Sequence, residues 1–166
     1  MRKVIAIVAL LGGILVAQTA PKKTAAGAAS KAAKPAATVM TPDKINWGDA
    51  PPVFQPGAKL AVLSGNPAAA GQFIVRLKFP DGYKVMPHWH PTAENVTVVS
   101  GEFHVGMGDK WNDAGMLALP ASSFASVPAH HSHYAVAKGE TIVQVSAMGP
   151  FKLVYVNPAD DPSKKK

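Results

Sequence analysis

The feature that most restricts the fold is the alternation, from about Ile45 onward, of short valine-rich apolar runs with turn signals that contain proline or glycine. Runs of this kind favour β-strands, and no stretch of the chain shows a sustained helical period. The predicted strands are residues 59–63, 72–79, 83–90, 94–99, 102–107, 116–119, 123–127, 131–137, 140–147 and 151–156. The pattern predicts an all-β domain, either a sandwich or a barrel.

The N-terminus has the layout of a secretory signal peptide. Arg2 and Lys3 precede an apolar run from Val4 to Val16, and the small and polar residues "AQTAP" follow it. The run is short for a helix that spans a bilayer. We therefore predict that residues 1–20 are a signal peptide with a signal helix, and that the protein is periplasmic or secreted. The alternative is an uncleaved anchor, which would hold the domain at a membrane.

Residues 21–44 are rich in Ala, Lys and Pro, and they predict a disordered linker because they offer almost no apolar side chain larger than alanine. The predicted domain spans residues 45–160, and residues 161–166 form a loose basic tail. The net charge of +7 comes from the two ends of the chain, since residues 45–163 carry seven basic and nine acidic side chains. The domain thus offers no basic patch for phosphates, and we expect no nucleic-acid partner.

The segment "MPHWHPTAENVTVVSG", residues 86–101, contains the candidate site. His88, His90 and Glu94 have the same parity, so along an extended strand they would point to one side. A two-residue hairpin turn at Ser100–Gly101 would place Glu94 opposite Met107. The predicted inner face is then Glu94, Val96, Val98, Phe103, Val105 and Met107, and His104 faces outward. A buried carboxylate needs a partner, and the two histidines predict a metal ion.

The fourth ligand is expected from "PAHHSH", residues 128–133, because all six histidines lie between positions 88 and 133. His131 and His133 share parity and His130 does not. A turn at Pro128–Ala129 would bring one of these histidines to the second strand of the site. The chain has no cysteine, so disulfides and thiolate ligands are excluded.

Gly82, His88, His90, Glu94 and Gly101 resemble the first cupin motif, G-x5-H-x-H-x3-E-x6-G, with every spacing kept. The resemblance implies a jelly-roll β-barrel of the germin-like type. The segments "GEFHVGMGDKW" and "GPFKLVYVNPADDP" are similar to those of small exported single-domain cupins of unassigned function. Homodimers through exposed sheet edges are also implied by the resemblance alone.

The second cupin motif, G-x5-P-x-G-x2-H-x3-N, is partly kept. Pro128 and His133 match, whereas Ser122 and His130 replace its glycines and Ala137 replaces its asparagine. The resemblance implies that His133 is the fourth ligand. His131 remains a second candidate for that role, and we also place it, with Val96, Phe103 and Met107, in the predicted pocket.

Three imidazoles and one carboxylate suit a divalent transition metal, namely Zn, Cu, Ni, Mn or Fe, and not calcium or magnesium. The affinity order favours zinc, copper or nickel. Coordination positions left open, together with what the cupin resemblance implies, predict a metal-dependent oxidoreductase, similar to a dioxygenase, that acts on a small chelating anionic or enolic substrate; an isomerase or a decarboxylase is the less favoured enzymatic alternative. The alternative is a non-catalytic module that holds or senses a metal or a small ligand. Beyond His131, the sequence names no catalytic acid or base.

Overall fold

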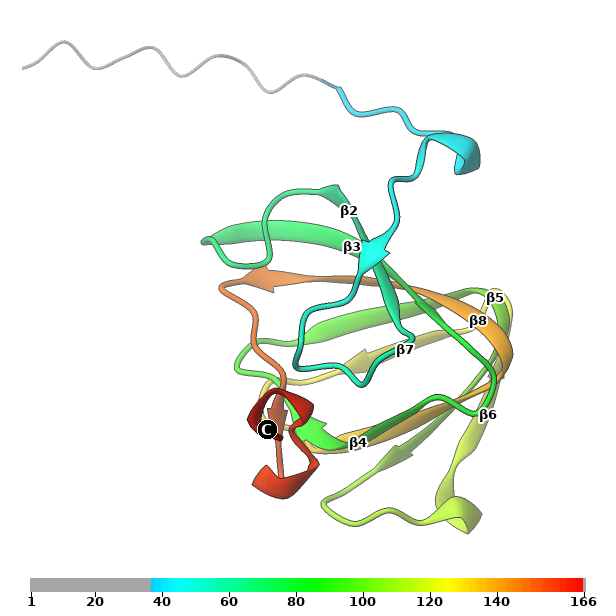
Figure 1. Cartoon of the computed structure of the whole chain (residues 1–166), viewed down its shortest axis with the longest axis vertical. Coiled ribbons are helices and arrows are strands. Elements are labelled where there is room, and N and C mark those ends of the chain that lie inside the picture. Colours follow the sequence, from blue (N-terminus) through cyan, green and yellow to red (C-terminus); the bar gives the residue numbers. More distant parts are fainter. Residues whose placement is uncertain (1–36, 166) are drawn as a thin grey trace, which may run out of the picture. The chain divides into compact units, whose positions relative to one another are not determined.

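The computed structural model describes residues 37–165 and shows a curled, all-β arrangement (Figure 1). This confirms the predicted fold class. The predicted signal peptide, and the linker up to Ala36, lie outside the described residues. Among residues 37–165, no helix has the length and apolar character needed to cross a bilayer.

The strands form nine segments: β1 (Gly48–Asp49), β2 (Lys59–Ser64), β3 (Gly71–Phe79), β4 (Lys84–Trp89), β5 (Glu94–Met107), β6 (Leu117–Pro120), β7 (Phe124–Val127), β8 (His133–Gly149) and β9 (Val154–Tyr155). Four single turns of 3-10 helix accompany them: η1 (Pro42–Lys44), η2 (Asp113–Gly115), η3 (Pro158–Asp160) and η4 (Pro162–Lys164). The tail that was expected to be loose thus contains η4, whose N-cap Asp161 accepts a hydrogen bond from the backbone N–H of Ser163.

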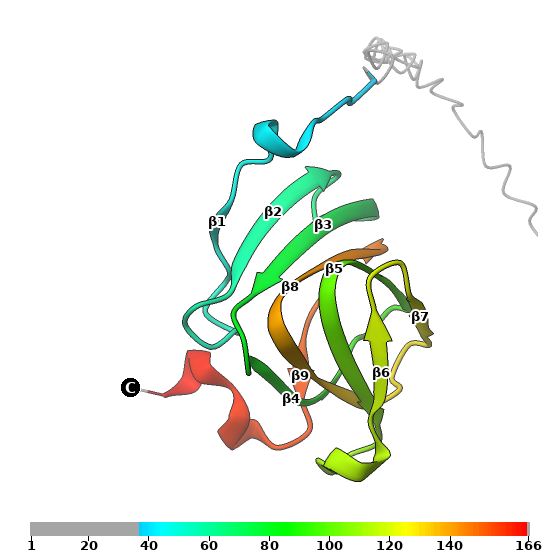
Figure 2. The ribbon, with the colours of Figure 1, turned by 90° about the vertical axis from the view of Figure 1, so that its right-hand side faces the viewer.

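Two long strands, β5 and β8, are antiparallel neighbours along almost their whole length (Figure 2). The first half of β5 also pairs with β7, and its second half pairs with β6. The C-terminal half of β8 pairs with β3, and its N-terminal half pairs with β4. Both strands therefore pass from one layer of the barrel into the other.

The passage between the layers occurs where the ladder of β5 and β8 is interrupted, at Ser100–Glu102 and Lys138–Ile142; we call this region the crease. Gly101 and Gly139 lie there with φ of 78° and 71°, a conformation that glycine adopts without steric cost. The predicted hairpin turn at Ser100–Gly101 is wrong, because β5 continues through it as a bulged strand.

The bulge explains why the predicted inner face is nevertheless mostly right. An extra residue in a strand changes the parity of the buried positions. Glu94, Val96 and Val98 are buried before the crease, and Phe103 and Val105 after it. Met107 is the exception, since it is 50% exposed at the end of β5.

The apolar core lies between the two layers and draws on strands β3, β4, β5 and β8. Phe79 stacks on Phe103 with ring centroids 5.7 Å apart and planes within 2° of parallel. Tyr83 stacks on the same Phe79 at 4.8 Å. These rings lie beside the crease, because Phe79 pairs with Thr141 and Phe103 pairs with Ala137.

Candidate metal centre

Four side chains gather away from the crease, where the two ends of the β5–β8 ladder come together. His88 comes from β4, His90 from the residue after β4, Glu94 from the start of β5 and His133 from the start of β8. All four are buried, and one ligand atom from each lies within 4.8 Å of the others. The structure therefore brings together the four residues that the sequence singled out as ligands.

Backbone pairing explains this convergence. His88 is the cross-strand partner of His133, with imidazole centroids 4.2 Å apart. Glu94 lies between Val127 of β7 and Ala147 of β8. His90 follows the end of its strand, and its carbonyl oxygen accepts a hydrogen bond from the N–H of His130 at 2.8 Å.

Each of the three imidazoles is oriented by a main-chain carbonyl. The Nδ1 atoms of His88, His90 and His133 lie 2.8, 2.8 and 3.0 Å from the carbonyl oxygens of Met86, Lys152 and His131. A carbonyl oxygen only accepts, so each Nδ1 must carry the hydrogen and donate it. The lone pairs of the Nε2 atoms are then available to coordinate a metal.

The convergent atoms of the site need a cation. Glu94 Oε1 lies 2.8 Å from His133 Nε2 and 3.4 Å from His90 Nε2. Burial alone would raise the pKa of Glu94, but hydrogen bonds from His133 and His90 outweigh it and hold that pKa well below its usual range. Such hydrogen bonds require a proton on Nε2 as well as on Nδ1. In the neutral imidazoles that a metal binds, Nε2 instead carries a lone pair directed at the Glu94 oxygen, and a divalent ion then satisfies all four atoms at once.

His88 is suited to be a neutral ligand. Burial lowers its pKa well below the usual value, and the neighbouring imidazoles of His133 and His90 lower it further. A metal requires the deprotonated nitrogen. The environment therefore already favours the form of His88 that binds.

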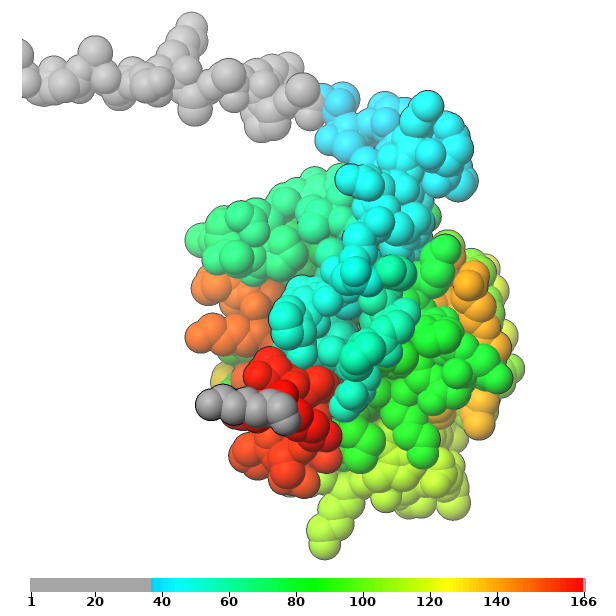
Figure 3. Space-filling view, viewed as in Figure 1, coloured from blue at the N-terminus to red at the C-terminus, as the bar shows by residue number. Residues whose placement is uncertain are grey.

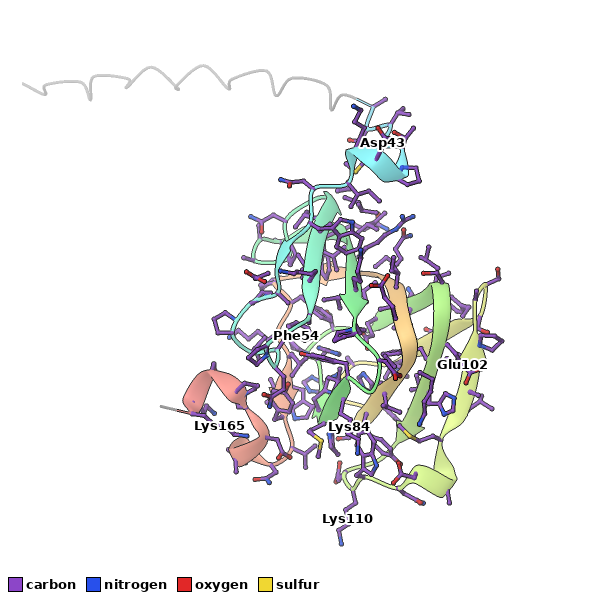
Figure 4. All side chains as sticks on the ribbon, turned by 45° about the vertical axis from the view of Figure 1, so that its right-hand side comes forward. Asp43, Phe54, Lys84, Glu102, Lys110 and Lys165 are labelled. Atoms are coloured by element: carbon purple, nitrogen blue, oxygen red, sulfur yellow. The ribbon has the colours of Figure 1, made fainter. Side chains whose placement is uncertain are left out.

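His131 does not face the pocket, contrary to its predicted place there. Its side chain is exposed, because β8 begins only at His133 and the parity argument does not extend into the preceding turn. Its contribution is the carbonyl that orients His133. His104 faces outward as expected, and its Nε2 lies 2.6 Å from Oε1 of Glu102 on the outer side of β5 (Figure 4).

A cavity of about 640 Å³ adjoins the four candidate ligands. Its walls are mostly aliphatic and aromatic side chains from both layers, including Val96 and Phe103 as expected. Met107 is not part of the wall. Strand parity gives the side on which a residue lies and not its depth, and the exposed end of β5 lies beyond the enclosed space.

Sequence reasoning missed the C-terminal contribution to the site. Phe151 stacks on His90 with centroids 4.3 Å apart, and Tyr155 of β9 is the cross-strand partner of His88. Lys152 supplies the carbonyl that orients His90. The only sequence signal was the similarity of "GPFKLVYVNPADDP" to other small cupins, because these contacts join positions far apart in the chain.

Residues 51–57 contribute Pro51, Val53 and Phe54 to the cavity wall, and we call this segment the strap. Two buried tyrosines hold it: Tyr155 donates to the carbonyl of Val53 at 2.9 Å and Tyr83 to that of Gln55 at 2.7 Å. Burial raises the pKa of Tyr155 to about 12, and it also raises the pKa of Tyr83. The strap lies beside the C-terminal turns on the surface (Figure 3), and Phe54 points inward toward Phe79 (Figure 4).

The two positions at which the second cupin motif has glycine adopt the left-handed backbone that favours glycine. Ser122 has φ of 74° and His130 has φ of 61°, and they are the non-glycine residues with positive φ among residues 37–165. The exchanges in the sequence therefore leave the turns intact and place strain in them.

Comparison with known proteins identifies a family and supports the fold. Residues 19–154 match the model of a family described as "Domain of unknown function (DUF4437)", and no curated protein matches. Similar solved structures include the polyketide cyclase RemF from Streptomyces resistomycificus, with 14% identity and a TM-score of 0.63 over 78% of this chain and 92% of that one.

A putative acetylacetone dioxygenase from Methylibium petroleiphilum has 21% identity and a TM-score of 0.60, over 78% of this chain and 87% of that one. An RmlC-like cupin from Shewanella frigidimarina has 24% identity and a TM-score of 0.53, over 68% and 91%. At these identities the solved structures support the fold alone. The chain has a cupin-like fold, and it belongs to the DUF4437 family, a domain of unknown function.

Proposed function

We propose that this cupin binds one divalent transition metal through His88, His90, Glu94 and His133. We further propose that it acts as a dioxygenase-like oxidoreductase on a small chelating anionic or enolic substrate. The observation that carries the proposal is the convergence of four buried donor atoms, with every imidazole oriented through Nδ1, beside an apolar cavity.

The donor set supports a first-row transition metal, because imidazole nitrogens suit zinc, copper, nickel and iron better than calcium or magnesium. A divalent ion with one carboxylate leaves a positive site, which favours an anionic substrate. When bound, the metal would supply Lewis-acid or redox chemistry at its open positions.

The protein side chains have three tasks in this proposal. The carbonyls of Met86, Lys152 and His131 fix the imidazole planes, so the ligands need no reorganisation when the metal binds. Phe151 packs against His90 and excludes water from one side of it. The apolar walls lower the local dielectric, which strengthens the attraction between the site and an anionic head group.

A non-catalytic module that holds or senses a ligand is the second candidate, and one observation favours it. Apart from the four ligands, Lys152 is the one acidic or basic residue in the described wall of the cavity, and it is exposed. In a reaction that needs a general acid or base, only the substrate itself or Glu94 could fill that role. The similarity in fold to a putative acetylacetone dioxygenase supports the enzymatic candidate only at the level of architecture.

Metal analysis and oxygen uptake of the purified protein test both candidates. The wild type should contain one metal per chain, His88→Ala should lose it, and His104→Ala should keep it because His104 faces outward. Oxygen uptake with small enols or hydroxy acids that disappears in His88→Ala would support the oxidoreductase. Reversible ligand binding without turnover would support the module, and full metal content in His88→Ala would overturn the site.

We also propose that the protein is exported, on the basis of the charged start and apolar run in residues 2–16. The mass of the mature protein tests this: cleavage near Ala20 is expected, and an intact Met1 would contradict it.

A further inference from the structure

The polar and apolar parts of the cavity are separated along the barrel. Glu94 and His133 lie at the ends of β5 and β8 that are distant from the crease. The cavity wall continues past them to Phe79 and Phe103, which lie beside the crease. The cavity therefore has its candidate metal ligands at one end and a stacked pair of aromatic rings at the other.

Between these two ends the wall is apolar. Val96 pairs with Val145 in one layer, and Val105 pairs with Ala135 in the other. Among the described wall residues, the polar side chains other than the four ligands are Asn66 and Lys152, which come from exposed connecting segments. A sugar or another polyol extending inward would leave its hydroxyl groups without protein partners, which is costly against an apolar wall.

The cavity is also larger than a compact chelator requires. Its volume of about 640 Å³ is in the range of pockets that take drug-sized molecules. A small diacid bound at the metal would leave the stretch between Val96 and Phe103 unfilled. An apolar group that occupies this stretch would instead gain burial in proportion to its area.

We propose that the natural ligand is an amphiphile, with an anionic bidentate oxygen head group at the metal and an apolar chain or ring that extends toward Phe79 and Phe103. This inference rests on the proposed metal site and names the class of ligand that the site takes. The side chains of Val96, Val143 and Phe103 are then specificity determinants, because they contact the apolar part and not the head group.

Affinity for a homologous series tests the inference. Zinc-loaded full-length protein is titrated by calorimetry with straight-chain 2-oxo carboxylates, from 2-oxobutanoate to 2-oxodecanoate. The head group is constant, so affinity should rise about fourfold for each added methylene until the chain reaches the aromatic end, and then level off or fall. Equal affinities along the series in the loaded protein would overturn the inference.

A variant at the far end locates the chain. Val143 is buried and lines the cavity near the crease, away from the metal ligands. Val143→Phe should lower the affinity for the longest acids to that of the short ones while leaving zinc content and 2-oxobutanoate affinity unchanged. The matched control is Val99→Phe, at an exposed position on β5. An unchanged chain-length profile in a folded Val143→Phe protein would overturn the assigned position.

Zinc content is measured before every titration, so that the two proposals fail separately. Wild-type protein that takes up no zinc, or any other transition metal offered, overturns the proposed function. Protein that is fully loaded but indifferent to chain length leaves that function standing and overturns only the ligand class.

Discussion

The two ends of the barrel are built from the same strands, β5 and β8, yet they are ordered by different interactions. At the crease, rings and aliphatic side chains pack against one another, and order depends on shape. At the ligand end, buried imidazoles are ordered by the hydrogen bonds that they donate to main-chain carbonyls. Folding stability and metal affinity should therefore respond to different substitutions.

We also expect the ligand end to accept side-chain exchanges that the crease does not. A carbonyl oxygen is supplied by any residue, so the side chains of Met86, Lys152 and His131 are free to vary while their oxygens keep orienting the imidazoles. Packing at the crease depends on side-chain volume. Four predictions follow from this contrast, beginning with the largest.

Phe103→Ala should lower the free energy of unfolding by about 3–5 kcal/mol, because it removes a buried ring from the stack with Phe79. Metal stoichiometry should stay at the wild-type value. Urea unfolding and metal analysis measure the two quantities. Phe124→Ala is the control, since that ring is 62% exposed and should cost under about 0.5 kcal/mol. Loss of metal from folded Phe103→Ala would show that the two ends are coupled.

Glu94→Gln should weaken metal binding more than about 100-fold. Loss of a residue that only supports a ligand costs at most about 100-fold, and loss of a ligand should cost more. The matched control is Glu102→Gln, on the outer side of the same strand, where the carboxylate pairs with His104. Competition with a chelator of known affinity measures both. Equal affinities in Glu94→Gln and the wild type would remove Glu94 from the site.

Tyr155→Phe should destabilise the protein by about 1 kcal/mol at neutral pH, because it deletes the hydrogen bond to the strap at Val53. Burial raises the folded-state pKa of Tyr155 from 10.0 to about 12. Its contribution to the free energy of unfolding is therefore complete below pH 10 and is lost as the pH rises to about 12. Unfolding free energies of the wild type should fall in that window.

The decline should be shallower in Tyr155→Phe and shallowest in Tyr83→Phe/Tyr155→Phe, because the pKa of Tyr83 is also raised. Urea unfolding across the window measures the slopes. Identical slopes in all three proteins would mean that the tyrosines are not held neutral by the fold.

The sequence predicted most of the strands, the inner face and the four ligand candidates, because each depends on a local period or a local spacing. It did not distinguish a hairpin from a bulge at Ser100–Gly101. Glycine with positive φ suits both, and the choice depends on pairing with β8, far along the chain. Phe151 and Tyr155 were missed for the same reason. His131 and Met107 were misplaced because strand parity was extended beyond the enclosed part of a strand.

The smallest effect is expected at a turn of the second cupin motif, where the backbone conformation and not a side-chain contact decides stability. Ser122 is exposed with φ of 74°, and its backbone N–H donates to the carbonyl of Val98. Left-handed backbone costs a non-glycine residue about 1–2 kcal/mol, and glycine adds about 0.5–1 kcal/mol of unfolded-state entropy. Ser122→Gly should therefore stabilise the protein by about 0.5 kcal/mol, as measured by urea unfolding. Ala121→Gly, at the preceding exposed position without positive φ, should destabilise it. If both glycine variants lose stability, the turn carries no strain, and the serine is as well suited to it as the glycine of the motif.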